Sequence, residues 1–147
     1  MFTGSTDTAR LIQQTLANRS GPLVPFIAET GGQNVMIVDS SALPEQVVAD
    51  VLLSSFNSAG QRCSALRVLF VQEEIADGLI EMLQGAMAEL TVGDPSLLAT
   101  DVGPVIDADA LRMLKNHLVK MQNEATVLYQ VPMKTLPPGH FFCARIG

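Results

Sequence analysis

The sequence predicts an α/β fold in which a parallel-rich sheet is flanked by helices. Short apolar runs alternate along the chain with longer segments of helical periodicity, which is typical of strands joined by helices. No segment repeats or has low complexity. The 147 residues are 48% hydrophobic and 16% charged, so the chain can form the core of about one domain.

Turn and cap signals in the first part of the chain predict a helix followed by two strands. Ser5 or Thr6 can cap a helix that runs through Asn18, and the Gly-Pro pair at 21–22 ends it. The apolar residues that follow predict strands at 23–28 and 35–38.

The middle of the chain predicts a second helix, a third strand and a third helix. Pro44 suits a first helical turn, and apolar residues then form a broad face as far as Ala59-Gly60. Residues 65–71 are expected to form a strand. Helical spacing follows over 75–90, where Gly78 and Gly85 lower the propensity.

The last part of the chain predicts one more helix. Asp107 or Asp109 can cap it, and leucines and a methionine follow at helical spacing over 111–121. Residues 126–129 are a candidate strand, and the Leu-Pro-Pro-Gly run at 136–139 is a turn.

Composition excludes several classes of partner. The net charge is −6 and no cluster of Lys and Arg is present, so nucleic acid is not an expected partner. No apolar run approaches the length that a membrane span requires, and the first residues show no basic region followed by an apolar stretch. We therefore expect the chain in the cytoplasm. The two cysteines, Cys63 and Cys143, are expected to be reduced there. We assign no metal site.

Cys63 is the candidate nucleophile. It ends the segment 57–63 (NSAGQRC), just after a glycine at the end of a predicted helix. A free thiol has a pKa of about 8.5, so backbone amides at the helix end and the adjacent Arg62 would have to favour the thiolate. The alternative is a small buried hydrophobic residue, which is common for a lone cysteine.

Glu29 is the candidate general base. It follows the predicted strand 23–28 and precedes Gly31-Gly32, so its carboxylate lies at the carboxyl end of a strand, where α/β sheets usually build their sites. The alternative is a surface glutamate at a strand end.

Four segments, at 2–6, 29–34, 57–64 and 93–104, resemble the aldehyde dehydrogenase superfamily in order and spacing. The resemblance implies that Cys63 adds to an aldehyde, that NAD accepts a hydride, and that water assisted by Glu29 hydrolyses the resulting thioester. Thr30 and Gln33 stand where the family often has leucine and lysine. In segment 93–104, Gly93-Asp94-Pro95 and Gly103-Pro104 are assigned to turns.

The resemblance also implies a place for the cofactor. Gly4 and Ser5 look like the family's turn into a helix that lies against the NAD pyrophosphate, where helix amides favour phosphate. Ala9 stands where the family often has a second glycine. The alternative reading of Gly-Ser-Thr at 4–6 is a helix cap.

Residues 58–69 most resemble the glutamate-semialdehyde (1-pyrroline-5-carboxylate) dehydrogenase module of bifunctional proline utilization A proteins. Arg62 and Ser64 flank the nucleophile as in that group, and we assign them to substrate binding. The resemblance implies oxidation of glutamate semialdehyde to glutamate with NAD in proline breakdown. It covers residues 2–130 well and weakens over 131–147.

A whole module of this kind is several times longer than 147 residues, so the resemblance implies a partial catalytic domain. Residues 1–28 resemble the tail end of the NAD-binding domain, and residues 29–147 resemble the N-terminal part of the catalytic domain. Besides a small aldehyde, the expected partner is a second copy of the chain or the rest of the module. The alternative function is a noncatalytic fragment or remnant that associates with itself or binds another chain.

Overall fold

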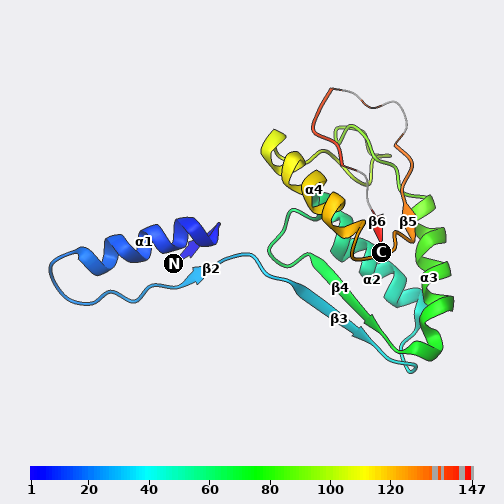
Figure 1. The fold of residues 1–147 in the computed structure, drawn as a ribbon, viewed down its shortest axis with the longest axis horizontal. Helices are drawn as coiled ribbons and strands as arrows, with labels where there is room; N and C mark the ends of the chain where they lie inside the picture. Colours follow the sequence, from blue (N-terminus) through cyan, green and yellow to red (C-terminus); the bar gives the residue numbers. More distant parts are fainter. Residues whose placement is uncertain (134–135, 137, 143–144, 147) are drawn as a thin grey trace.

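The fold has an arm and a body (Figure 1). The structure is a computed structural model that describes all residues except 134–135, 137, 143–144 and 147. The arm contains β1, α1 and β2, and the body contains the remaining elements. Their bounds are β1 Phe2–Thr3, α1 Thr6–Asn18, β2 Ala28–Glu29, β3 Asn34–Val38, α2 Pro44–Phe56, η1 Asn57–Gly60, β4 Leu66–Val71, α3 Glu73–Ala88, α4 Ala108–Met121, β5 Tyr129–Gln130 and β6 Arg145–Ile146.

The arm is a short parallel strand pair joined by one helix. β1 pairs with β2 in parallel, with Thr3 opposite Glu29. α1 begins as predicted, because the Ser5 hydroxyl accepts a hydrogen bond from the Thr8 amide at 3.1 Å. The predicted strand over 23–28 is wrong except at Ala28. In the described part of the chain β2 pairs only with β1, whose two residues limit the length of the pairing.

The body is organised around the parallel pair of β3 and β4, with α2 as the connection between them. Both α2 and α3 pack on one face of this pair (Figure 1). Burial of apolar side chains is the main favourable contribution to such packing. The buried members of this first core are Val38, Val47, Val48, Val51, Leu66, Leu79 and Leu83.

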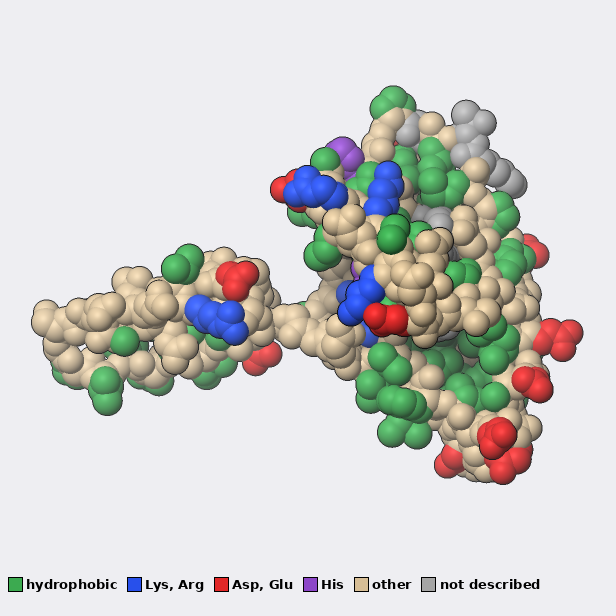
Figure 2. Space-filling view, viewed as in Figure 1, with side chains coloured by type: hydrophobic (Ala, Val, Ile, Leu, Met, Phe, Trp, Pro, Cys, Tyr) green, Lys and Arg blue, Asp and Glu red, His purple; other side chains and the backbone are tan. Residues whose placement is uncertain are grey.

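The other face of the β3–β4 pair is apolar and exposed. Val35 and Ile37 on β3 lie in register with Val68 and Phe70 on β4, and Ile37 is 78% exposed. Figure 2 shows hydrophobic side chains gathered over this part of the body. Parallel strands are usually covered on both faces. Only one face is covered by the described residues, and we call the other the open β3–β4 face.

A second core joins the C-terminal segments to the helices. Its buried members are Met87, Val92, Val102, Val131 and Phe141. The strands β5 and β6 form an antiparallel pair, so the described strands make three separate pairs instead of one sheet. The candidate strand over 126–129 is therefore displaced to Tyr129–Gln130, where pairing with β6 is available.

The last helix and the nearby turns follow their local signals. The Asp107 carboxylate caps α4 by accepting a hydrogen bond from the Ala110 amide at 2.7 Å. In the turn at Asp94, the carboxylate accepts a hydrogen bond from the Ser96 amide at 2.9 Å. This bond and one from the Ser96 hydroxyl lower the pKa of the Asp94 carboxyl. This geometry agrees with the structural role predicted for 93–95.

A left-handed segment links α2 to the turn that carries Cys63. The predicted helix ends at Phe56, earlier than expected, and Ser58, Ala59 and Gly60 follow with φ of 57°, 53° and 68°. Left-handed conformation costs a non-glycine residue roughly 1–2 kcal/mol. A Cβ at Gly60 would lie 2.8 Å from the Ser55 carbonyl oxygen, so glycine is required there.

We predict that Gly60→Ala lowers the free energy of unfolding by about 2 kcal/mol or more, because it combines left-handed strain with a backbone contact. The matched control is Gly85→Ala in α3, where an added Cβ meets nothing within 4 Å. That change should raise the free energy of unfolding by up to about 1 kcal/mol through helix propensity. Urea titration followed by far-UV circular dichroism measures both, and equal stability of the two variants would contradict the prediction.

Candidate active site

An open pocket of about 370 Å³ lies where the arm meets the body. Its walls come from the ends of β1 and β2 and from the turn before β4. The pocket therefore lies at the carboxyl end of one parallel pair and at the amino end of the other. The residues that line it are Thr3, Gly4, Glu29, Thr30, Gly31, Gln61, Arg62, Cys63 and Arg67.

The pocket brings together four of the six predicted site residues. Glu29 and Cys63, the candidate base and nucleophile, both line it, as do Gly4 and Arg62. Ser5 and Ser64 are not among its lining residues. Ser64 is exposed.

Cys63 is exposed and lies in a turn that leads into β4. The turn is closed by a hydrogen bond from the Ala65 amide to the Arg62 carbonyl at 3.2 Å. The helical segment before Cys63 ends at Gly60, and a helix end of this kind presents carbonyls. The expectation that helix-end amides favour the Cys63 thiolate stays a prediction. The buried hydrophobic alternative does not fit an exposed thiol.

The Arg62 side chain turns back onto α2. Its Nη2 donates to the carbonyls of Leu53 at 3.0 Å and Ser54 at 3.3 Å, which lie in the last turn of that helix. A cation is stabilised there by the helix dipole. The Nε atom is buried and has no hydrogen-bond acceptor among the described residues. Arg62 thus anchors the turn to α2 through its guanidinium group.

Glu29 ends β2, and its backbone carbonyl accepts a hydrogen bond from the Gly4 amide at 3.1 Å. Within the described chain its carboxylate has no hydrogen-bond donor and no ion-pair partner. The residue is exposed. Its backbone is fixed by the strand pair while its carboxylate remains available to a water molecule in the pocket.

Gly4 and Ser5 shape the start of α1. A Cβ at Gly4 would lie 2.6 Å from the Phe2 ring, so a larger residue there would displace that ring. The Ser5 hydroxyl accepts from the Thr8 amide and donates to the Thr8 hydroxyl at 2.9 Å. The helix-cap reading of Ser5 is thus confirmed, and its contact with pyrophosphate stays a prediction.

Three residues that the sequence analysis left without a role shape this site. Asn34 hydrogen-bonds the turn that carries Cys63. Gln61 accepts a hydrogen bond from the Ile106 amide at 2.7 Å, which ties the same turn to the segment after Gly103-Pro104. Arg67 donates to the Gly60 carbonyl at 2.6 Å. Asn34 and Gln61 stand inside the quoted motifs, but motifs do not show the direction of a side-chain hydrogen bond.

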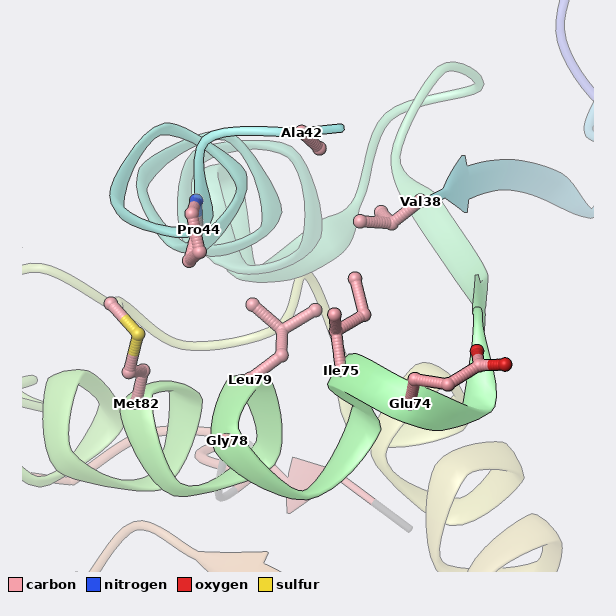
Figure 3. A pocket seen from close by; sticks show the side chains of 8 residues that line it. All are labelled: Val38, Ala42, Pro44, Glu74, Ile75, Gly78, Leu79 and Met82. Atoms are coloured by element: carbon pink, nitrogen blue, oxygen red, sulfur yellow. The ribbon is translucent and has the colours of Figure 1, made fainter. Parts of the chain in front are cut away.

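A second hollow, of about 280 Å³, lies between α2 and α3 (Figure 3). It is lined mainly by apolar side chains and contains none of the predicted site residues. Glu74 is its one ionisable residue, and in Figure 3 the carboxylate points away from Leu79 and Met82. This hollow has no group that could act on an aldehyde.

The described residues offer neither a metal-binding cluster nor a membrane-spanning helix. They contain no group of three or more His, Cys, Asp or Glu side chains placed to hold a metal ion. None of their helices combines the length and apolar character that crossing a bilayer requires.

Sequence comparison gives a family and several similar proteins. The profile of the aldehyde dehydrogenase family matches residues 1–146. The match therefore continues past residue 130, beyond which the motif resemblance is weaker. The bifunctional protein PutA of Klebsiella aerogenes is 57% identical over 133 residues, which are 88% of this chain and 10% of that protein. The 1-pyrroline-5-carboxylate dehydrogenase of Bacillus thuringiensis is 31% identical over 130 residues, 86% of this chain and 25% of that protein.

Solved structures show the same fold. A mutant (D779W) of Bradyrhizobium japonicum proline utilization A matches with a TM-score of 0.90 and 55% identity, over 98% of this chain and 14% of that one. A 1-pyrroline-5-carboxylate dehydrogenase from Thermus with bound NAD matches with a TM-score of 0.84 and 24% identity, over 98% and 28%. The chain thus spans about a tenth of the curated PutA proteins it matches.

We predict that Cys63 reacts with iodoacetamide faster than Cys143, because access and thiolate population control the alkylation rate. Cys143 lies outside the described residues. Mass mapping of peptides after timed labelling measures both rates in one sample, and labelling in urea gives the intrinsic difference as a control. Equal or reversed labelling of the native chain would remove Cys63 as an activated nucleophile.

Proposed function

The chain belongs to the aldehyde dehydrogenase family, and we propose that it supplies the nucleophile and general base for NAD-dependent oxidation of glutamate semialdehyde to glutamate. One observation carries the proposal: Cys63 and Glu29, 34 residues apart in the sequence, line the same pocket. The substrate is proposed from the 57% identity to the PutA protein of Klebsiella aerogenes, which extends over most of this chain. A role in proline catabolism follows from that substrate.

The proposed chemistry is two rounds of addition followed by elimination. The Cys63 thiolate adds to the aldehyde carbon, which gives a tetrahedral thiohemiacetal. Loss of a hydride leaves a thioester on Cys63. Glu29 then takes a proton from water, the hydroxide adds to the thioester carbon, and collapse releases the carboxylic acid and the thiolate. NAD, when bound, supplies the acceptor for the hydride.

The start of α1 fits a phosphate group. The first amides of a helix have no intrahelical acceptor, and the Ser5 hydroxyl satisfies only that of Thr8. The turn at Gly4 lines the pocket. We therefore propose that Gly4, Ser5 and the first amides of α1 hold the pyrophosphate of NAD. Asp7 in the first turn opposes this attraction, so the affinity depends on the rest of a nucleotide fold.

The proposed substrate carries a carboxylate in addition to its aldehyde. Arg62 lines the pocket and carries a positive charge, which supports a role in meeting that carboxylate. For Ser64 the support is only its position next to the nucleophile. The assignment of residues 1–28 and 29–147 to two domains, and the location in the cytoplasm, remain predictions.

The second candidate function is a noncatalytic fragment that self-associates or binds another chain. The open β3–β4 face favours it, since Ile37 and Phe70 are 78% and 55% exposed there. Exposed apolar patches of this kind mark interaction surfaces. The two candidates differ in chemistry, because a remnant would retain a reactive thiol at most.

We predict that Glu29→Gln slows hydrolysis of p-nitrophenyl acetate by about 10²-fold, because it removes the base that activates water. The acylation burst that precedes this step should change by less than about threefold, since Cys63 still attacks the ester. Stopped-flow release of nitrophenolate resolves the burst from the steady state. Glu81→Gln, an exposed change in α3, is the control. An unchanged steady-state rate in Glu29→Gln would remove Glu29 from the mechanism.

We predict that the 147-residue chain binds NAD with a dissociation constant on the order of 1 mM or weaker. The arm provides one helix and one strand pair, whereas the adenosine half of NAD requires more of a nucleotide fold. Loss of nicotinamide orientation should also lower turnover of glutamate semialdehyde by about 10³-fold or more. Calorimetric titration and absorbance of reduced nicotinamide test both. Micromolar binding with sustained turnover would exclude the fragment reading.

A further inference from the structure

We propose that Asn34 is a positioning residue that holds the turn carrying Cys63 in place against the segment carrying Glu29. The proposal rests on the proposed function in one respect, namely that Cys63 is the nucleophile. Asn34 touches no reacting atom. Its role is to fix the backbone on which Cys63 is mounted.

The evidence is a pair of short hydrogen bonds from one amide group. The Asn34 Nδ2 atom donates to the Cys63 carbonyl at 2.7 Å and to the Ala65 carbonyl at 2.8 Å. An asparagine NH₂ group has two donors, so both are used on one turn. The two carbonyls lie on either side of Ser64, and the amide therefore spans the turn directly after the nucleophile.

The fold places Asn34 where it can reach this turn. Asn34 begins β3 and pairs with Leu66 at the start of β4, but the next pair is Val35 with Val68. Arg67 is therefore an extra residue in β4, which makes a bulge. Bulges redirect neighbouring side chains and are common beside active sites. Asn34 is partly buried at this irregular point, where the turn with Cys63 enters the strand.

These hydrogen bonds restrict the nucleophile through its peptide plane. The peptide from Cys63 to Ser64 is planar, so fixing the Cys63 carbonyl fixes the plane and limits rotation about the Cys63 backbone. Glu29 lies five residues before Asn34 on the same segment. Among the described residues, no other side chain of 28–34 makes a hydrogen bond to 57–65. Asn34 thus couples the two walls of the pocket.

The test uses Asn34→Ala and Asn34→Asp in the full chain with Cys143→Ala, so that Cys63 is the single thiol. Asn34→Asp keeps the side-chain size but sets a carboxylate against two carbonyls. Asn116→Ala, an exposed change in α4, is the matched control. Three quantities are measured: iodoacetamide alkylation of Cys63, deacylation after reaction with p-nitrophenyl acetate, and amide hydrogen exchange of peptides covering 62–66.

Both Asn34 variants should deacylate more slowly by about 10- to 100-fold, because a displacement of about 1 Å between reacting groups has an effect of this size. Alkylation should stay within about twofold of the parent, since it requires only an exposed thiolate. Hydrogen exchange over 62–66 should become faster in Asn34→Ala and stay unchanged in Asn116→Ala.

Two outcomes would overturn the proposal. The first is a folded Asn34 variant that deacylates like Asn116→Ala. The second is a loss of deacylation that only follows the loss of folded protein, with alkylation changed in proportion. If the parent chain forms no acyl-enzyme, the proposed function fails, and the exchange measurement alone decides: faster exchange in Asn34→Ala supports the positioning role, and unchanged exchange overturns it.

Discussion

Residues of β3, α2 and α3 share the first core, and the positions of the candidate site residues in the body follow from that packing. Burial of Val38, Val51 and Leu79 holds α2 on one face of the β3–β4 pair. The chain must then return from the end of α2 to the start of β4 within nine residues, 57–65. The left-handed segment and the turn with Cys63 occupy this return. Two non-glycine residues of this return have positive φ, a conformation that persists only where the surrounding structure holds it.

The helices could be predicted from the sequence because their signals are local. Ser5 and Asp107 cap α1 and α4 as expected, and Pro44 begins α2. The short strands were less predictable, since β2 and β5 end where their partners end. The left-handed Ser58 and Ala59 carry no composition signal, because glycine is the residue that normally marks this conformation.

The candidate site was predictable in its residues more than in its contacts. The motifs identified Cys63 and Glu29, and the fold places both at one pocket. The sequence could not show that Arg62 turns toward α2 or that Asn34 reaches the Cys63 carbonyl, since both depend on how distant segments approach. Side-chain hydrogen bonds of this kind are set by tertiary structure, and residue spacing does not encode their direction.

The open β3–β4 face has a consequence for handling the chain. In the described chain β3 and β4 pair only with each other, so each leaves one edge with unpaired backbone N–H and C=O groups. These two edges border the exposed Ile37 and Phe70. Apolar strand edges act as templates for further strands, and native proteins usually block them with charges or proline. Aggregation should therefore increase steeply with protein concentration, and a charged residue introduced along either edge should reduce it.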